Sequence, residues 1–358
     1  MSNYEQRLAS DKNEIRHRVV NVGRSAESAV AAAVRGLLER DAQLCYQTML
    51  GDLPINREVR AIDKLCHAFV ARHLPSAGHL RFVSSALRMN VALERIGDYA
   101  VTIAREAVQL TRPVPDLLAS DIRELARQAC EVLRNALLAF SERDVELARQ
   151  TRPRARSVER TYAQLHQHLT QKGAELPLPD AFGLLMVFHR LERVNDQAQN
   201  ISEETLFELT GEMKPLKPYR ILFVDDDGAR LAPLAEALAR KAFPQSGSYT
   251  SAGFAPAGRL STDLERLARD LPLDLKNIAP RGLVGAHDEL EAYDVIVTLT
   301  PNAYERIGNV PYGTVLLSWT VPLHRHAVDS YALLGEAGRE LAVNIRDLMV
   351  LIRGDDAH

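Results

Sequence analysis

The stretch ALERIGDYAVTIA at residues 92–104 is similar to the stretch RLERVNDQAQNIS at residues 190–202, with an offset of 98 residues. A second pair of similar stretches, VRAIDKLC (59–66) and ARSVERTY (155–162), precedes the first pair with an offset of 96 residues. Apolar residues recur every three or four positions through this region, which is typical of amphipathic helices. Repetition of a three-helix unit predicts two similar helical bundles stacked together.

Residues 1–210 are therefore predicted to form an all-α domain with two repeats, at about 1–112 and about 116–210. Pro113 divides the region near its middle and leaves three predicted helices on each side. The turn-like stretch GDLP (51–54) predicts an interruption of one helix, because proline removes a helical hydrogen bond.

A change of pattern follows the linker at 211–219, which contains glycine, two prolines and two lysines. Three short apolar runs are predicted strands: RILFV (220–224), YDVIVTL (293–299) and TVLLSW (314–319). Helical patterns lie between them, and this alternation favours a parallel sheet covered by helices on both faces. The chain is thus predicted to be multidomain, with an α/β domain at 220–358.

Composition argues against a nucleic-acid-binding protein, a disulfide-bonded protein and a membrane-spanning protein. The net charge of −3 provides no basic field for nucleic acid. Cys45, Cys66 and Cys130 have neither disulfide nor zinc spacing, so buried free thiols in a reducing compartment are expected. The N-terminus is polar, and no apolar stretch approaches the ~20 residues of a membrane span. We expect a cytoplasmic protein that reaches the inner membrane only through partners.

Two acidic motifs stand at matching places in the repeats. Glu94 precedes Asp98, and Glu192 precedes Asp196, by four residues, so each pair shares one helix face. Like charges at this spacing repel, and hard cations prefer carboxylate oxygens gathered from facing helices. The preceding helix of each repeat adds one more acidic residue, which completes two candidate metal sites: Asp63, Glu94 and Asp98, and Glu159, Glu192 and Asp196.

The alternative for these residues is a solvated or arginine-neutralised face. Arg60 and Arg156 lie three residues before Asp63 and Glu159, and either arginine could neutralise the carboxylates without a metal. An isolated ExxxD motif is common on solvated helices. Its duplication at matching positions of an internal repeat favours functional carboxylates.

The helical region resembles the PhoU family of phosphate-uptake regulators over about residues 5–210. The resemblance rests on INREVRAIDKLC (55–66), LERIGDYA (93–100) and LERVNDQAQNI (191–201). It implies that the six acidic residues bind clusters of metal ions such as iron, zinc or magnesium. It also implies a non-enzymatic, negative regulator of phosphate transport and homeostasis that contacts the phosphate transporter or its sensor histidine kinase. The resemblance is also compatible with a homodimer.

Residues of about 218–352 resemble low-molecular-weight tyrosine phosphatases and the related arsenate reductases. The resemblance rests on RILFVDDDGARLAPLAEAL (220–238), SAGFAPAG (251–258) and YDVIVTLTPNAYERI (293–307). It implies a parallel sheet whose first strand leads into a phosphate-binding loop and a helix.

The catalytic residues of that family are absent at the matching positions. Asp225 stands in place of the nucleophilic cysteine, Leu231 in place of the loop arginine and Ala232 in place of the following serine. Leu323 and His324 stand where the family has the aspartate and proline of its general acid. The α/β domain is therefore predicted to be a pseudo-phosphatase that is retained for binding or as a scaffold.

The acidic loop Asp225-Asp226-Asp227 leaves alternatives open. Three carboxylates repel a phosphate dianion, so the loop would hold a cation or be solvated. A phosphatase or arsenate reductase would instead turn over p-nitrophenyl phosphate or arsenate. ILFVDDD (221–227) also resembles the acidic cluster of response-regulator receivers, although YDVIVTL ends at Leu299-Thr300, without the aspartate that would accept a phosphoryl group.

Overall fold

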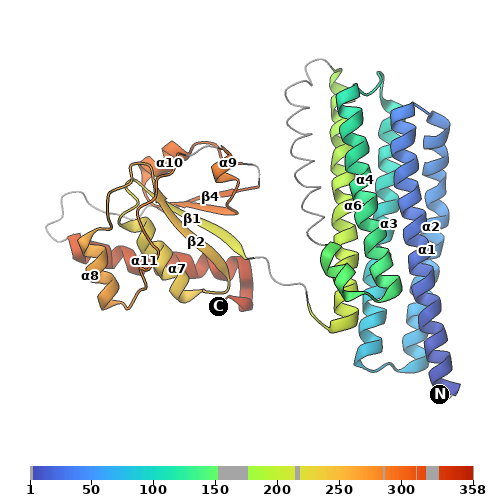
Figure 1. Cartoon of the computed structure of the whole chain (residues 1–358), viewed down its shortest axis with the longest axis horizontal. Coiled ribbons are helices and arrows are strands. Elements are labelled where there is room, and N and C mark those ends of the chain that lie inside the picture. Colours follow the sequence, from blue (N-terminus) through green and yellow to red (C-terminus); the bar gives the residue numbers. More distant parts are fainter. Residues whose placement is uncertain are drawn as a thin grey trace. The chain divides into compact units, whose positions relative to one another are not determined.

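The chain divides into two compact units, Met1–Pro215 and Leu216–His358, which are called the helical unit and the α/β unit. The computed structural model is drawn in Figure 1. It describes residues 3–151, 176–213, 218–284, 287–311, 313–319 and 330–357.

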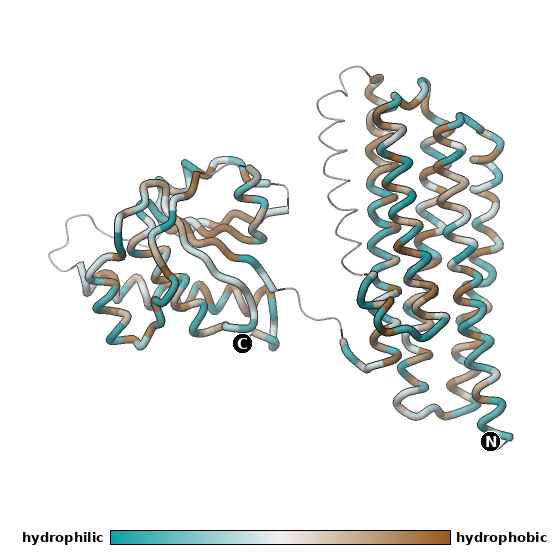
Figure 2. Tube along the Cα trace, in the orientation of Figure 1, coloured by the Kyte–Doolittle hydropathy of each residue, from teal (hydrophilic) through white to brown (hydrophobic). Residues whose placement is uncertain are grey.

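Long helices lie side by side in the helical unit (Figure 1). They are α1 (Asn3–Glu39), α2 (Ala42–His73), α3 (Ala77–Gln109), α4 (Asp116–Glu142) and α6 (Leu178–Thr210). Each carries hydrophobic and hydrophilic residues along its length (Figure 2), and the hydrophobic ones form one core that includes Phe69, Phe82, Phe140 and Phe188. The all-helical prediction is confirmed. No helix in the described ranges is long and apolar enough to cross a membrane.

The predicted interruption at residues 51–54 is wrong. Helix α2 continues through Pro54, and the chain turns earlier, at Arg40, which has a φ of 55°. Asp41 then caps α2 by accepting a hydrogen bond from the Leu44 N–H at 2.9 Å. Pro54 removes one backbone hydrogen bond, but the burial of neighbouring Ile55 in the core holds the helix together.

The connection between the two repeats is tied to the start of α6 by Asp180. Its buried carboxylate accepts hydrogen bonds from the Thr111 N–H (3.0 Å), the Thr111 hydroxyl (2.9 Å) and the Arg112 N–H (3.1 Å). The bond from the Thr111 N–H is the largest of the effects that lower the pKa of Asp180. The turn beside Pro113 is therefore held against α6 by a single carboxylate.

The α/β unit is built on a parallel four-stranded sheet in the order β2-β1-β3-β4, which confirms the predicted fold class. The strands are β1 (Tyr219–Asp225), β2 (Gly247–Gly253), β3 (Val295–Thr298) and β4 (Val315–Ser318). The helices are α7 (Leu231–Ala242), α8 (Thr262–Asp270), α9 (His287–Leu290), α10 (Pro301–Ile307) and α11 (Ser330–Arg353), followed by the 3-10 turn η2 (Gly354–Asp356).

Helices cover both faces of this sheet (Figure 1). Alternate residues of β1 enter different cores, because successive side chains of a strand point to opposite faces. Ile221 and Phe223 pack with residues of α7, α8 and α11, whereas Leu222 and Val224 pack with residues of α9 and α10. The carboxyl end of β1 is thereby enclosed between two hydrophobic layers, and this position holds Asp225.

Candidate functional site

The acidic residues of the first repeat lie on α2 and α3, two helices that pack against each other. Glu94 and Asp98 are one turn apart on α3, with Glu94 half-buried and Asp98 exposed. Asp63 on α2 is half-buried, and its Oδ1 accepts a hydrogen bond from Nδ2 of Asn90 at 2.8 Å. Neither Glu94 nor Asp98 forms an ion pair with another described residue.

The structure adds Asp52 to this face, a residue that the sequence analysis did not include. Nδ2 of Asn56 donates to Asp52 Oδ2 at 2.5 Å. Burial raises the pKa of Asp52, and the nearby carboxylate of Asp98 raises it further. Asp52 was missed because the stretch 51–54 was interpreted as a helix break. Within an uninterrupted α2, Asp52 and Asn56 are one turn apart on one face.

The acidic pair of the second repeat has a different environment. Nδ1 of His189 lies 3.3 Å from Oε2 of Glu192, and Arg193 donates from Nη1 to Oδ2 of Asp196 at 2.7 Å. Burial raises the pKa of Glu192, and the charge of Asp196 adds to this shift. Both His189 and Arg193 lie on α6 itself, so the partners of the second pair come from its own helix.

Five of the six predicted metal ligands lie in the described residues, and Glu159 lies outside them together with Arg156. Arg60 is exposed and forms no ion pair with a described residue. Across the ranges that the structure describes, no three His, Cys, Asp or Glu side chains are grouped so that they could hold a metal ion. The six-residue ligand set thus stays a prediction.

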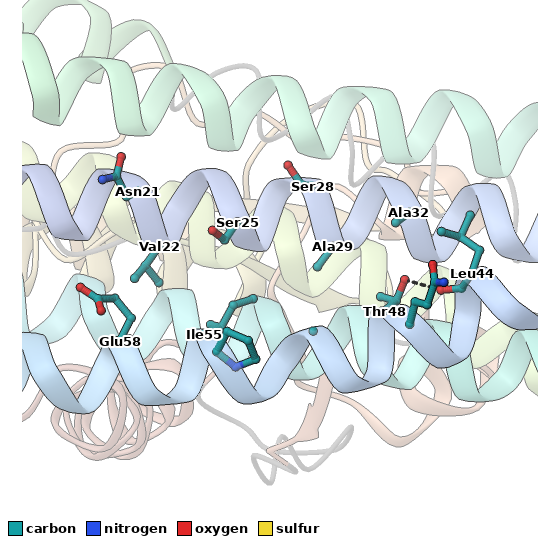
Figure 3. Close-up of a pocket in the computed structure, with 13 residues that line it drawn as sticks. Asn21, Val22, Ser25, Ser28, Ala29, Ala32, Leu44, Thr48, Ile55 and Glu58 are labelled. Carbon is teal, nitrogen blue, oxygen red and sulfur yellow. Dashed lines mark hydrogen bonds between the residues drawn. The ribbon is translucent and has the colours of Figure 1, made fainter.

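A groove of about 590 Å³ lies between α1 and α2 (Figure 3). Ser25 and Ser28 line it from α1, and Thr48 lines it from α2. Glu58 also lines the groove and is paired with Arg18 at 3.1 Å. None of the five predicted ligands that the structure describes lines the groove.

In the α/β unit, the carboxylate of Asp225 turns back into the loop that follows β1. The Gly228 N–H donates to Oδ1 of Asp225 at 2.5 Å, and the Ala232 N–H donates to Oδ2 at 3.0 Å. Asp227 accepts a bond from the Ala229 N–H at 2.9 Å. Backbone N–H groups before and at the start of a helix can bind an anion. In this loop the chain's own carboxylates occupy them, and Asp225 is only 3% exposed.

The remaining loop residues are also held by neighbouring side chains. Oδ1 of Asp226 accepts hydrogen bonds from the Thr300 hydroxyl at 3.2 Å and from Nδ2 of Asn302 at 2.6 Å. Arg230 is exposed and pairs with Asp227 at 3.2 Å, whereas Leu231 is buried. The residues at 323 and 324, which replace the family's general acid, lie outside the described residues.

Asp225 is expected to make the stability of the α/β unit fall as pH rises. Burial raises the pKa of Asp225 from 3.8 to about 6, and the opposing backbone hydrogen bonds do not cancel this effect. The folded state therefore binds the proton more tightly than the unfolded state, and this contribution is lost as pH rises through about 6. The loss should reach about 3 kcal/mol above that pH.

Urea unfolding at several pH values would measure this effect. The fluorescence of Trp319, the sole tryptophan of the chain, reports on the α/β unit, where the ring packs near Phe223. The Asp225→Asn variant cannot titrate at this position and is the matched control. The same pH dependence in both proteins would show that another group is responsible.

The helical unit is similar to known proteins over both repeats. It matches the family model of the PhoU domain over residues 19–107 and 122–205. The chain is 31% identical over 209 residues to the phosphate-specific transport system accessory protein PhoU homolog of Pseudomonas putida, which covers 58% of this chain and 82% of that protein. The crystal structure of PhoU from Pseudomonas aeruginosa matches with a TM-score of 0.53 and 28% identity, over 57% of this chain and 99% of that chain.

The α/β unit has weaker structural matches. The tyrosine phosphatase Wzb from Escherichia coli K30, solved in complex with sulphate, matches with a TM-score of 0.30 and 20% identity, over 36% of this chain and 99% of that chain. With a TM-score this low, the architecture of the unit rests on its own strand order and register. The matches of the helical unit include the motifs that were recognised in both repeats. The chain therefore belongs to the PhoU family.

Proposed function

We propose that this protein is a non-enzymatic, negative regulator of phosphate uptake that acts through protein contacts. The main support is the match of both helical repeats to the PhoU domain, together with 31% identity to a phosphate-specific transport system accessory protein. The partners that we propose are a phosphate transporter and a sensor histidine kinase. Contact would take place at the cytoplasmic face of the inner membrane, which the protein would reach only through these partners.

We further propose that the α/β unit is a binding or scaffold module without phosphatase activity. Cysteine-based phosphatases need a thiolate nucleophile and free N–H groups that stabilise phosphate oxygens. The chain has no cysteine after Cys130, and the carboxylate of Asp225 occupies N–H groups of the loop. Buried Leu231 at the arginine position supports the same conclusion.

The two rival functions make different predictions. A phosphatase or arsenate reductase would turn over p-nitrophenyl phosphate or arsenate. A receiver would form an acid-labile phosphoaspartate with a small phosphodonor. The receiver is disfavoured because β3 ends at Thr298 and continues into Leu299 and Thr300, so no carboxylate follows this strand directly.

Genetic complementation in the source bacterium would test the regulatory role. Deletion of the gene is expected to raise a phosphate-starvation reporter in phosphate-rich medium, and the full chain should restore repression. The variant with Asp226→Asn and Arg230→Ala should repress equally well, because neither change removes a core side chain. An unchanged reporter after deletion would contradict the regulatory role. Loss of repression in the loop variant would instead favour chemistry at this loop.

A further inference from the structure

A row of exposed residues runs along the outer face of α2, opposite buried Ile55 and Val59. Its members follow one another at intervals of four and three residues, so they share one side of the helix. We call it the outer row, and it has an apolar part followed by a basic part: Tyr46, Leu50 and Leu53, then Arg57, Arg60 and Lys64. The three apolar side chains are 56%, 67% and 57% exposed. Single exposed apolar residues are ordinary, but adjoining ones on one helix face mark an interaction surface.

The basic part of the outer row is unpaired within the described chain. Arg57, Arg60 and Lys64 are exposed, and none of them forms an ion pair with another described residue. No acidic residue belongs to the row itself. The row extends over about 27 Å of helix from Tyr46 to Lys64. A ligand that covers the whole row therefore needs apolar groups at one end and negative charge at the other.

The groove between α1 and α2 lies beside the apolar part. Gln47, Gly51 and Pro54 line this groove, and each of them directly follows an apolar residue of the row. The α1 wall includes small side chains (Figure 3), namely Ser25, Ser28, Ala29 and Ala32. A Cβ atom at residue 51 would meet nothing within 4 Å, so the groove is open at this point. Apolar side chains of a partner helix that covers the row can enter such a groove, which is a common mode of helix recognition.

The order of the residues favours a protein helix over a membrane surface. A helix that lies on a membrane has apolar residues along its length and basic residues on the opposite face. In the outer row, the two kinds of residue instead follow one another along the helix axis. The apolar part, at residues 46–53, is only about 11 Å long. A lipid surface would therefore match only part of the row.

A second copy of the chain also matches the row incompletely. In a two-fold dimer, both copies present the same surface to each other. Contact between the two apolar parts would leave the basic parts without a negative partner. Contact over the whole row would place a basic part against an apolar part or against another basic part. Charge complementarity therefore favours a different protein that supplies acidic residues.

We propose that the outer row and the adjoining groove are the docking surface for an amphipathic helix of the regulatory partner, an inference that rests on the proposed function. The apolar residues of the partner helix pack on the apolar part and enter the groove. Its Asp and Glu residues pair with the basic part. Negative side chains are most favourable near a helix N-terminus, so the partner helix runs antiparallel to α2.

Photo-cross-linking of the full-length protein in the source bacterium would test this surface. Gln47, which lines the groove, is replaced by p-benzoylphenylalanine, and the cross-linked segment is identified by mass spectrometry. The expected segment has apolar residues at helical spacing that follow a group of Asp and Glu residues. A cross-link to another copy of this chain, a cross-link to lipid or the absence of any cross-link would overturn the proposal.

Variants of the two parts should both weaken the contact. Leu50→Gln with Leu53→Gln removes the apolar part, and Arg57→Glu with Arg60→Glu reverses the charge of the basic part. Each double variant should lower the cross-link yield at least about tenfold. Lysine in place of the acidic residues of the partner segment should restore the cross-link of the charge-reversal variant. A variant that had merely lost its fold would not be restored in this way.

The matched control changes the same residue types on α4. Leu138 is 47% exposed and Arg123 is also exposed, so Leu138→Gln with Arg123→Glu should leave the cross-link unchanged. Gly51→Gln should raise the stability of α2, because Gln is a better helix former than Gly, and yet weaken the cross-link because its side chain enters the groove. Undiminished cross-linking of the row variants or of Gly51→Gln would contradict the assigned surface.

The phosphate-starvation reporter separates this inference from the proposed function. If deletion of the gene leaves the reporter unchanged, the regulatory role fails, whatever the cross-link shows. If deletion raises the reporter and the two row variants still repress it fully, the regulatory role holds and the docking surface fails. Loss of repression in both row variants but not in the α4 control would support both.

Discussion

Replacement of Glu208 by alanine is expected to lower the free energy of unfolding of the helical unit by about 3–5 kcal/mol. Glu208 on α6 is 5% exposed, and its Oε1 lies 2.8 Å from Nη2 of Arg16 and 3.5 Å from Nζ of Lys12. Arg16 is 8% exposed and also donates to the Phe140 carbonyl at 2.7 Å. Without Glu208, two cations would remain near the ring of Phe82 with no anion.

The matched control for this prediction is Glu212→Ala. Glu212 pairs with Arg149 at 3.2 Å, but both side chains are largely exposed, so its loss should change stability by less than about 0.5 kcal/mol. Urea unfolding followed by far-UV circular dichroism would measure both variants, because helices dominate that signal. The double variant Arg16→Leu and Glu208→Leu should be less destabilised than Glu208→Ala, because it leaves a smaller uncompensated charge. Equal effects of Glu208→Ala and Glu212→Ala would contradict the prediction.

Gly253→Ala is expected to destabilise the α/β unit by about 3 kcal/mol. A Cβ atom at residue 253 would lie 2.2 Å from the Gly228 nitrogen and 2.6 Å from the Asp227 carbonyl carbon. These are backbone atoms, which cannot move aside as a side chain can. Gly228 itself has a φ of 63°, a conformation that favours glycine. The contact of the β1 loop with the end of β2 therefore requires both glycines.

Gly258→Ala is the control for the change at Gly253. Gly258 is exposed, and a Cβ atom there would meet nothing within 4 Å, so stability should change little. Urea unfolding monitored by Trp319 fluorescence would compare the two variants. The Gly253 variant should also shift the titration of Asp225, whose partner Gly228 would be displaced. Equal stability of the two variants would show that the loop can move away from β2 at little cost.

The strands and most of the helices were predicted from the spacing of their apolar residues. The strands at 220–224 and 293–299 were recognised because buried parallel strands consist of short apolar runs between helical patterns. The helices around residues 92–104 and 190–202 were recognised because their apolar spacing follows the helical period. The break expected at 51–54 was wrong because the packing of α2 outweighs the local preference of Pro54.

The candidate sites were predicted less completely, because pairing depends on neighbours that are distant in sequence. Asp98 was recognised from its motif, but its interaction with Asp52 exists only because α2 and α3 pack together. The loop acids were expected to repel phosphate, whereas the structure turns Asp225 inward onto its own N–H groups.

The sequence by itself determined the repeated helical unit, the parallel α/β unit and the absence of any cysteine after Cys130, because periodicity and residue identity are local properties of the chain. The tertiary structure decided which carboxylates have partners. Asp196 is paired with Arg193, while Oδ1 of Asp52 is buried without a partner. The physical reason is that burial and charge pairing depend on which helix faces are brought together, and a motif of four-residue spacing is the same in both environments.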